Sequence, residues 1–326
     1  MRISSVMGAI CRMASGHHQL EVAGTRIMVT GAGGFVGRRL CDALRSQNAV
    51  VIGAGRSGEA VGEDGVAFDL LDEAAVSDAV SHIGPDVVVH LAAQSSVGQS
   101  AGRAADTWAT NVGGSLNLAR AVATSAPQAC LLFASSSEVY GRAFLTGKAH
   151  ENTMPQPQSA YARSKRAAEE MLADVLSASN QLIVARPGNH TGRGQDSRFV
   201  APSFASQVVK GGDVRVGNLQ ARRDFLHVDD VVDAYVALLK NRAALPSRST
   251  FNVASGVPVQ IGFVLEQLIQ LSQSSPKVVV DPELVRPVDI EVAELDASKI
   301  ATAIGWSPRR SLADALLDVL QGVSKI

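Results

Sequence analysis

The sequence predicts a doubly wound α/β fold, in which helices cover both faces of a parallel sheet. Short apolar runs alternate with helical patterns over the first 187 residues, as they do in chains whose parallel strands are joined by crossover helices. A glycine-rich turn follows the first apolar run, at the place where such sheets bind phosphates. With 326 residues, the chain is long enough for this sheet and for a second, smaller α/β lobe.

The expected strands are short and mostly rich in valine, isoleucine or leucine, as strands buried on both faces are. They span residues 26–30, 50–54, 66–68, 87–90, 131–133 and 182–185. Helices are expected over the amphipathic stretch 36–44 and over 111–123 and 161–177. Beyond residue 187, prolines and the pair Gly211-Gly212 interrupt the pattern, so this half is expected to supply most of the smaller lobe.

The segment Thr30-Gly-Ala-Gly-Gly-Phe-Val-Gly37 has the strand, glycine turn and helix that a pyrophosphate site needs. Gly31 would permit the tight turn, Gly34 would let backbone amides approach the phosphates, and Gly37 would let the helix pack closely on the strand. The spacing is G-x-x-G-x-x-G, and a purely structural turn is the alternative. The functional prediction is a bound dinucleotide.

Tyr161 and Lys165 are four residues apart, so on a helix their side chains share one face. A phenol titrates near ~10, and a neighbouring ammonium lowers its pKa and makes it usable for proton transfer. An isolated pair of this kind more often belongs to an ordinary surface helix. Here Ser135-Ser-Ser-Glu138 also follows an apolar strand, and ligands of parallel sheets bind beyond the carboxyl ends of the strands. Together these residues predict hydride and proton transfer.

Seven segments, in order along the chain, resemble the nucleotide-sugar branch of the extended short-chain dehydrogenase/reductase superfamily. They are 30–37, His90-Leu-Ala-Ala-Gln94, Asn111-Val-Gly-Gly114, Ser135-Ser-Ser-Glu-Val-Tyr-Gly141, Tyr161 to Lys165, Arg186-Pro-Gly-Asn-His190 and Arg223-Asp-Phe-Leu-His-Val228. Within the branch, segments 189–195, 223–225, 286–289 and 305–308 look most like GDP-4-keto-6-deoxy-mannose reductases and GDP-mannose 4,6-dehydratases. The resemblance implies an NAD(P)-binding Rossmann domain over 25–187 and a nucleotide-sugar lobe formed mainly by 188–326, part of which returns to the Rossmann domain.

The resemblance also assigns chemistry to four residues of this sequence. Tyr161 would donate a proton to a substrate carbonyl oxygen while a hydride arrives from the nicotinamide, and Ser136 would hydrogen-bond the same oxygen. Lys165 would hold the nicotinamide ribose as well as lower the pKa of Tyr161. Glu138 falls where dehydratases keep a base.

The expected cofactor is NADP(H) rather than NAD(H). The second strand runs into Gly53-Ala-Gly-Arg56 with no acid before Glu59, and an arginine suits a 2′-phosphate whereas an acid suits the ribose hydroxyl. The alternative for Arg56 is that it is only a solvated loop charge. Asp69 is expected near the adenine, but it could equally be the N-cap of the next helix. The full set of expected cofactor contacts is Gly31, Gly33, Gly34, Phe35, Val36, Arg56, Asp69, Leu70, Leu91, Ala92, Ala93, Tyr161 and Lys165.

Four polar residues are expected to bind the nucleotide sugar, namely Ser137, Asn189, Arg223 and Arg286. The two arginines would neutralise the diphosphate through forked hydrogen bonds, although each alone could be a surface charge. Asp224 could instead be structural, pairing within the Arg-Asp turn. His190 and His227 lie among apolar neighbours and are expected in the core.

The first functional prediction is reduction of the 4-keto group of a nucleotide-linked 6-deoxy sugar, with GDP-4-keto-6-deoxy-D-mannose as the expected substrate. The chain has Ser136 where GDP-mannose dehydratases usually have threonine, and it lacks their longer arginine- and serine-rich segment after the second strand. Glu138 keeps a GDP-mannose 4,6-dehydratase open, and an NDP-sugar 4-epimerase, which usually prefers NAD, is a further alternative. A non-catalytic dinucleotide-binding module is the last alternative, but such modules typically lack the tyrosine or the lysine.

Composition and charge bear on partners and compartment. The formal net charge is -1, so no basic field favours nucleic acid. Cys11, Cys41 and Cys130 fit no disulfide or metal spacing, so no metal is assigned and a reducing cytoplasm is expected. Residues 1–24 are expected to be a flexible extension, because Arg12 interrupts the apolar run that a signal or membrane segment needs. The family resemblance implies a homodimer built from the helices over 111–123 and 161–177.

Overall fold

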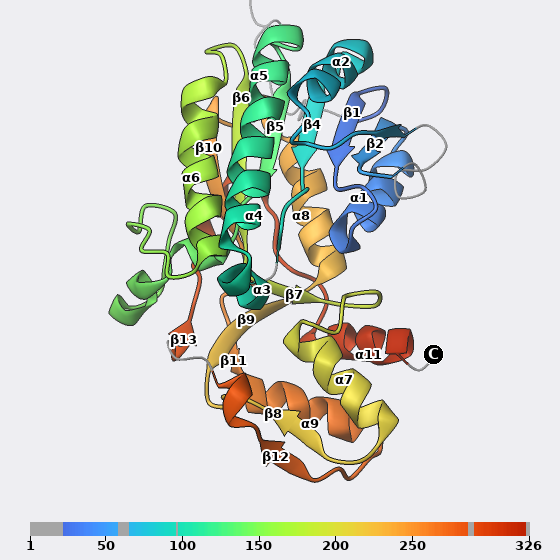
Figure 1. Ribbon diagram of the computed structural model, residues 1–326, viewed down its shortest axis with the longest axis vertical. Coiled ribbons are helices and arrows are strands. Elements are labelled where there is room, and N and C mark those ends of the chain that lie inside the picture. The colour runs from blue at the N-terminus through green and yellow to red at the C-terminus, as the bar shows by residue number, and fades with distance from the viewer. Residues whose placement is uncertain (1–21, 58–64, 96, 286–289, 324–326) are drawn as a thin grey trace, which may run out of the picture.

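Within the residues that the computed structural model describes, 22–57, 65–95, 97–285 and 290–323, seven strands form one parallel sheet (Figure 1). Their order is β10-β6-β5-β4-β1-β2-β3. The strands are β1 (Arg26–Thr30), β2 (Val50–Gly55), β3 (Val66–Ala67), β4 (Val87–His90), β5 (Cys130–Ala134), β6 (Gln181–Pro187) and β10 (Arg248–Val253). This sheet confirms the predicted doubly wound fold, and the expected strands agree with the observed ones to within two residues at each end.

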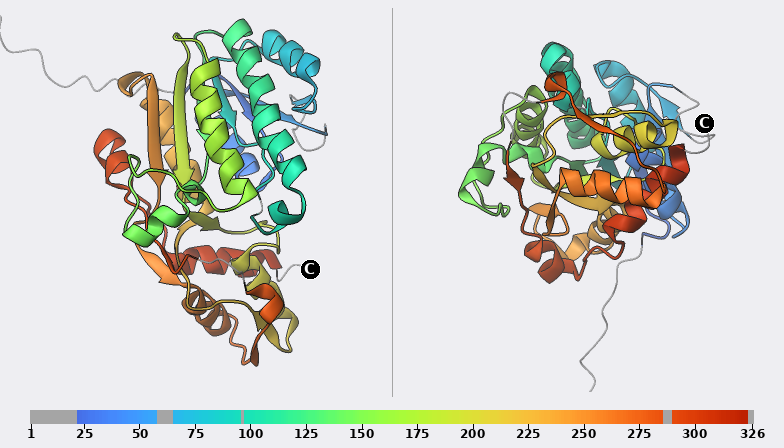
Figure 2. Two further views of the ribbon diagram at one scale, coloured as in Figure 1. Left: turned by 60° about the vertical axis from the view of Figure 1, so that its left-hand side comes forward. Right: turned by 90° about the horizontal axis from the view of Figure 1, so that it is seen from below.

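Helices cover both faces of the sheet because its strands are apolar on both sides. Ile27 and Val29 of β1 pack on one face, under α1 (Phe35–Arg45) and α8 (Val228–Lys240). Met28 points to the other face, which is covered by α2 (Glu73–Ile83), α5 (Ser115–Ser125) and α6 (Ala160–Val175). The two layers of helices are visible on either side of the sheet in Figures 1 and 2. Two cores therefore hold the sheet domain together, one on each face.

The expected helix over 111–123 is interrupted. Residues Ala109–Gly114 form a wider π-helical turn, η2, and α5 begins only at Ser115. The segment before the π turn contains two short helices, α3 (Val97–Gly102) and α4 (Ala104–Trp108). A π turn inserts one residue into the helical repeat, so the apolar periodicity on either side of it still reads as helix. The sequence pattern could not show this break.

The smaller lobe lies beyond the carboxyl edge of the sheet, at the bottom of Figure 1. Among its described residues, β9 (Arg222–His227) pairs with β7 (Asn189–Thr191), β11 (Pro258–Gln260) and β13 (Val292–Ala293), and β8 (Val214–Val216) pairs with β12 (Val278–Val280). Helices α7 (Val200–Lys210), α9 (Ile261–Leu271) and α11 (Leu312–Val323) pack around their own apolar core. Strand β10 lies in the second half of the sequence yet belongs to the main sheet, beside β6.

The remaining described elements are short. They are the 3₁₀ helices η3 (Ser137–Val139), η4 (Arg142–Thr146), η5 (Arg242–Ala244) and η6 (Pro282–Leu284), and the helix α10 (Ser298–Ile304). No helix among the described residues is both long and apolar enough to span a bilayer. Arg286, Glu59, Cys11 and most of the expected N-terminal extension lie outside the described residues.

Arg39 of α1 joins the sheet domain to the lobe. Its Nη1 lies 2.7 Å from Asp229 Oδ1 at the start of α8, and its Nη2 lies 3.1 Å from Asp318 Oδ2 on α11. Nearby, the ring of Phe35 lies parallel to that of His190 on β7, with 6.1 Å between centroids. These contacts place the glycine turn that precedes α1 directly beside the lobe.

Candidate active site

The turn between β1 and α1 has room only for glycine at two positions. Gly31 has φ +71, and a Cβ there would lie 2.9 Å from the backbone nitrogen of Ala92. A Cβ on Gly37 would lie 2.1 Å from the carbonyl oxygen of Gly31 and 2.8 Å from that of Ala32, closer than atoms of a side chain can approach. The turn is therefore pressed against the loop after β4 on one side and against its own helix on the other.

The amino end of α1 is suited to an anion. Its N-cap is Gly34, and no described side chain caps it. The first turn also contains no acidic residue. Backbone N–H groups at such an end attract anions through their partial positive charge. These residues fit the pyrophosphate of a dinucleotide, because glycine at these positions lets an anion approach the backbone at the start of α1.

Ser136 and Tyr161 are brought together at the carboxyl end of β5. Ser136 follows β5 and is 8% exposed; Tyr161 lies in the first turn of α6, which Ser159 caps by accepting from the backbone N–H of Ala162 at 3.0 Å. Ser136 Oγ accepts from the backbone N–H of Glu138 at 3.2 Å and lies near enough to Tyr161 to favour the ionised form of the phenol. The two hydroxyls that the sequence predicts as catalytic therefore lie at the same edge of the sheet.

The structure corrects the expected pKa of Tyr161. Burial, together with the charge of Glu138, raises the pKa of Tyr161 to about 12, and the nearby Ser136 hydroxyl opposes this increase only in part. The sequence predicts instead that the ammonium of Lys165 lowers this pKa. The phenol loses its hydration in the interior, and this penalty on the charged form is the larger effect. Tyr161 therefore stays protonated at neutral pH.

Lys165 shares the expected helix face but is directed at the sheet. Its Nζ donates to the carbonyl oxygen of Ala134 at 2.7 Å and lies 4.6 Å from the centroid of the Phe133 ring. The side chain is buried, and burial lowers the pKa of Lys165 to about 7 although Glu169 opposes the shift. Lys165 is therefore a buried amine that can exist in either protonation state near neutrality.

Sequence reasoning missed a buried network under these residues. Arg186 Nε and Nη2 donate to the two carboxylate oxygens of Glu169 at 2.9 and 2.6 Å, and Arg186 Nη1 donates to the Tyr140 hydroxyl at 3.0 Å. The hydroxyl of Ser135 donates to the same carboxylate, and that of Tyr140 to Asn252. Glu169 follows Lys165 by four residues on the same helix face, which was the available signal.

The residues expected near the adenine and its ribose differ in exposure and in hydrogen bonding. Arg56 lies exposed just beyond β2, and Leu70 is buried. Asp69 accepts a hydrogen bond from the backbone N–H of Leu71 at 2.9 Å. The N-cap of α2 is Asp72, whose side chain accepts from the backbone N–H of Ala75 at 3.0 Å. The alternative that Asp69 caps this helix is therefore wrong.

The expected sugar-binding residues lie on the lobe side and beside Ser136. Asn189 is half-buried on β7, and Ser137 is buried after β5. Arg223 of the neighbouring strand β9 is half-buried, and its Nη1 donates to the carbonyl oxygen of Ile290 at 2.7 Å. Arg286 lies outside the described residues.

Three polar residues near these strands have structural contacts. Asp224 does not pair within the Arg-Asp turn: its carboxylate accepts from the backbone N–H groups of Ser255 and Gly256 at 2.9 and 2.6 Å. His227 is buried, and its Nδ1 accepts from the backbone N–H of Asp229 at 3.0 Å. His190 is half-buried against Phe35. All three stabilise loops or helix ends.

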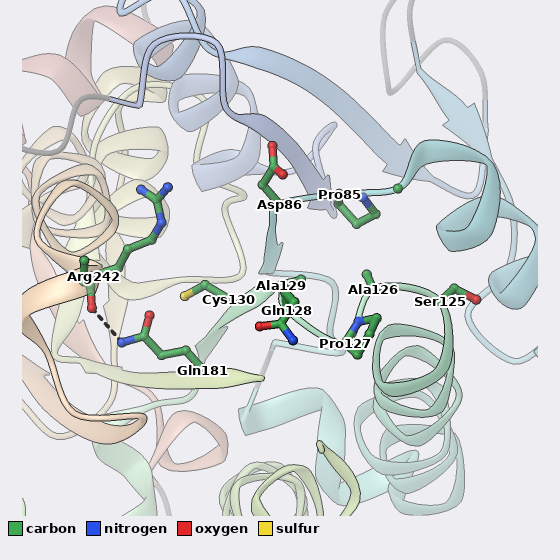
Figure 3. A pocket seen from close by; sticks show the side chains of 12 residues that line it. Pro85, Asp86, Ser125, Ala126, Pro127, Gln128, Ala129, Cys130, Gln181 and Arg242 are labelled. Carbon is green, nitrogen blue, oxygen red and sulfur yellow. Dashed lines mark hydrogen bonds between the residues drawn. The ribbon is translucent and has the colours of Figure 1, made fainter. Parts of the chain in front are cut away.

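A hollow of about 420 Å³ lies at the opposite end of the sheet (Figure 3). Its lining comes from the segments that precede β4 and β5, from the start of β6 and from the residues after α8, and it includes Asp86, Cys130, Gln181 and Arg242. None of the predicted site residues lines it. The glycine turn and the Ser136–Tyr161 pair are at the carboxyl edge of the strands, so this hollow is separate from the candidate site.

Comparison with known proteins assigns the family. A model of the NAD dependent epimerase/dehydratase family matches residues 27–254. The chain belongs to this family. Among the described residues of this epimerase/dehydratase-family enzyme, no group of three or more histidine, cysteine or acidic side chains could hold a metal ion.

The relatives of this family member are nucleotide-sugar enzymes. It is 31% identical over 303 residues to the GDP-6-deoxy-D-mannose reductase of Pseudomonas aeruginosa, covering 90% of this chain and 96% of that protein. A solved structure of RMD from Pseudomonas aeruginosa complexed with NADPH matches with a TM-score of 0.81 at 30% identity, over 93% of this chain and 100% of that one. A UDP-glucose 4-epimerase of Thermus thermophilus complexed with NAD matches with a TM-score of 0.83 at 28% identity, over 92% and 99%. The chain is thus an NAD(P)-binding nucleotide-sugar oxidoreductase.

Gly37→Ala should weaken nicotinamide-dinucleotide binding by about 10-fold or more, because the new Cβ must displace the Gly31 carbonyl and overpacking of this kind costs about 1–3 kcal/mol. Titration of NADPH and NADH by fluorescence measures the change. The matched control is Gly102→Ala, an exposed position with nothing within 4 Å of the added Cβ. Equal affinities of the two variants would contradict the tight-turn argument.

The buried amine of Lys165 should make stability rise with pH above neutrality. Between its folded pKa of about 7 and its ordinary value of 10.5, the unfolded chain binds the lysine proton and the folded chain does not, so unfolding becomes less favourable as pH rises. From about pH 7 to about pH 8.5, the wild type should gain about 1.6 kcal/mol relative to Lys165→Met, measured by urea unfolding. Both proteins share all other titrating groups. If their free energies of unfolding depended on pH in the same way, the pKa of Lys165 would not be lowered in the folded protein.

Proposed function

We propose that this enzyme uses NADPH to reduce the 4-keto group of GDP-4-keto-6-deoxy-D-mannose. The observation that carries the proposal is the placement of Ser136, directly after β5, close to Tyr161 in the first turn of α6, at the edge of the sheet that also carries the glycine turn. The 31% identity to a GDP-6-deoxy-D-mannose reductase over 90% of the chain supports the choice of substrate. The likeness to an RMD structure that contains NADPH supports the choice of cofactor.

The chemistry needs one hydride and one proton. When bound, the reduced nicotinamide supplies the hydride to C4 of the sugar. Tyr161 donates its hydroxyl proton to the C4 oxygen, which converts the ketone into a secondary alcohol, and Ser136 hydrogen-bonds that oxygen as negative charge develops on it. Lys165 supplies the positive charge that a tyrosinate needs once the proton has left.

The protonation state of Tyr161 favours the reductive direction. A reductase needs the tyrosine as an acid, whereas the oxidative first step of an epimerase or a dehydratase needs it as a base. Burial raises the pKa of Tyr161 to about 12, so the phenol starts in the protonated form.

NADPH is proposed over NADH because of the loop after β2. Arg56 is exposed at the end of that strand, where a guanidinium can form a charge-assisted bond with a ribose 2′-phosphate. The expected contacts from Gly31, Gly33, Gly34, Phe35 and Val36 would hold the pyrophosphate. Leu91 and Ala92 lie against the same turn, and Ala93 is proposed to contact the cofactor beside them. Asp69 and Leu70 are proposed beside the adenine.

The nucleotide sugar is proposed to lie between Ser136 and the lobe. Asn189 and Arg223 lie on the neighbouring strands β7 and β9, and Ser137 adjoins the catalytic serine. Arg223 and Arg286 would neutralise the diphosphate. One nitrogen of Arg223 already donates to Ile290, which holds the guanidinium at the strand so that fewer rotamers are lost on binding.

A 4,6-dehydratase is the second candidate, and Glu138 is the observation that favours it. The carboxylate is half-buried and near enough to Tyr161 for its charge to raise the pKa of the phenol. A base at this position suits removal of the proton beside a newly formed ketone. In a reductase, Glu138 has no such proton to remove, so its substitution separates the two candidates.

We also propose that two copies associate through the α5 and α6 side of the sheet domain. Trp108 of α4 is 40% exposed and Leu71 is 50% exposed, and a Cβ on Gly113 of η2 would touch Leu71. Large apolar side chains that stay exposed beside these helices are typical of an interface between subunits.

Purified protein should oxidise NADPH when GDP-4-keto-6-deoxy-D-mannose is added, and NMR should identify an alcohol at C4 of the product. Tyr161→Phe should lower kcat by about 100-fold or more, since it removes the proton donor, whereas Glu138→Gln should retain most of the activity. Conversion of GDP-mannose to the keto sugar without net cofactor use, abolished by Glu138→Gln, would assign the dehydratase instead.

Arg56→Ala should raise the KM for NADPH by about 10- to 100-fold, because a hydrogen bond to a charged group contributes about 1.5–3 kcal/mol. The KM for NADH should stay within about 2-fold, because NADH has no 2′-phosphate. Arg45→Ala, which removes an exposed arginine at the end of α1, is the control. A parallel loss with both cofactors would show that Arg56 does not read the phosphate.

A further inference from the structure

A continuous chain of hydrogen bonds runs from the loop after β4 to the first turn of α6. It links two regions that the proposed function uses, the turn around Gly31 and the backbone of Tyr161. Its members, in order, are Ala92, Thr30, His90, Ser115, Asn111, Ser164 and Tyr161. The side chains of Thr30, His90, Ser115, Asn111 and Ser164 are all buried.

His90 is the centre of this chain. It pairs in register with Thr30 on the adjacent strand β1, which places the Thr30 hydroxyl 2.7 Å from His90 Nδ1. On its other side, His90 Nε2 lies 2.8 Å from the Ser115 hydroxyl. The ring also lies 5.7 Å from that of Phe133, whose face carries Lys165. The imidazole therefore has a hydrogen-bond partner at both nitrogens and no access to water.

The direction of the hydrogen bonds around His90 follows from the backbone carbonyl of Asn111, which can only accept. The carbonyl oxygen of Asn111 lies 2.6 Å from Ser115 Oγ, so the single Ser115 proton points to that carbonyl. Ser115 must then accept from His90, which assigns the His90 proton to Nε2. Nδ1 is left as an acceptor for the Thr30 hydroxyl. Thr30 in turn accepts from the backbone N–H of Ala92 at 3.3 Å.

Beyond Ser115, the chain reaches the catalytic helix through Asn111. The side-chain oxygen of Asn111 accepts from the backbone N–H of Gln94 at 2.8 Å, which fixes the orientation of the amide. Its Nδ2 then donates to Ser164 Oγ at 2.9 Å. Ser164 donates to the carbonyl oxygen of Tyr161 at 2.8 Å. Every proton in the chain is thereby assigned, and no bond has two donors or two acceptors.

The chain also explains the π turn. Asn111 lies within η2, and Ser115 is the first residue after it. The bond from the Ser115 hydroxyl holds the Asn111 carbonyl at a position where the normal helical repeat is broken. Such turns are frequent at functional sites because they re-aim a side chain. Here the side chain that is re-aimed is the Asn111 amide, which contacts both Gln94 and Ser164.

A protonated His90 would break this order. Its Nδ1 would carry a second proton toward Thr30, whose own proton would then have no partner in the chain. Burial and the nearby charge of Lys165 lower the pKa of His90 to about 3. The groups that face the ring are Thr30, Ser115, Phe133 and Lys165, and none of them is an acid that would favour the cation. One tautomer is therefore maintained at neutral pH.

We propose that His90, held as the neutral Nε2–H imidazole, is a positioning residue that fixes the π turn and, through Ser115 and Asn111, the backbone of Tyr161. This inference rests on the proposed function for its catalytic consequence only. The tautomer and the order of the chain follow from the structure alone. A single hydrogen-bonded path then fixes the position of Tyr161, the proton donor, relative to the glycine turn.

Nitrogen NMR of histidine-labelled protein tests the tautomer without any substrate. In the wild type, the unprotonated nitrogen of His90 should be Nδ1 throughout the range from about pH 6 to about pH 8, with exposed His82 as the reference. In Ser115→Ala, Nε2 loses its partner, so the tautomer ratio of His90 should change. A proton on Nδ1 in the wild type, or an unchanged ratio in Ser115→Ala, would overturn the proposal.

Turnover tests the positioning role. Ser115→Ala should lower kcat by about 10-fold, because a displacement of well under an ångström already weakens a near-attack geometry. The KM values for both substrates should stay within about 2-fold, and Ser115→Thr, which keeps the hydroxyl, should recover most of the loss. Ser125→Ala, on the same helix, is the control.

The two experiments separate the failure of this inference from failure of the proposed function. If the wild type does not reduce the keto sugar, the proposed substrate is wrong, and the NMR result still decides the tautomer. If the wild type is active and Ser115→Ala turns over as fast as Ser125→Ala, the chain does not position Tyr161 and the proposal fails.

Discussion

The position of α6 depends on an ion pair in the interior between Glu169 and Arg186. Both side chains are 4% exposed, and Arg186 Nη2 lies 2.6 Å from Glu169 Oε2. A second contact, from Arg186 Nε, makes the pair two-pronged, so it fixes the orientation of the helix as well as its distance from β6. Removing one partner of such a pair leaves an uncompensated buried charge, which costs about 3–5 kcal/mol. Tyr161 and Lys165 take their places from the helix that this pair holds.

Burial then sets the chemistry of the residues that α6 presents. Tyr161, Lys165 and His90 have all lost their water, and each is shifted toward its neutral form, the phenol upward and the two bases downward. The neutral phenol is the form that can donate a proton. The neutral imidazole is the form that allows a single order of hydrogen bonds through Ser115 and Asn111. The same desolvation therefore prepares a proton donor and fixes the chain of contacts behind it.

The lobe and the sheet domain meet at the glycine turn. Arg39 reaches from α1 to Asp318 of α11, while Phe35 lies against His190 of β7. The residues that would contact pyrophosphate and those that would contact the sugar are therefore attached to one rigid junction. A dinucleotide at the glycine turn and a nucleotide sugar at the lobe would therefore bind on either side of these contacts. This arrangement suits an enzyme that must align a hydride donor with a carbonyl carbon.

The sequence by itself determined the fold class and six of the seven strands of the main sheet to within two residues at each end, and it predicted the glycine turn, Ser136 and Tyr161 as parts of one site. These features follow from local rules, since apolar runs, glycine spacing and a four-residue helical repeat are all visible along the chain. The tertiary structure alone decided the pKa directions of Tyr161 and Lys165, the Glu169–Arg186 pair, the π turn and the His90 chain. Each of those depends on burial or on partners from distant strands, and neither is expressed in the spacing of residues along the sequence.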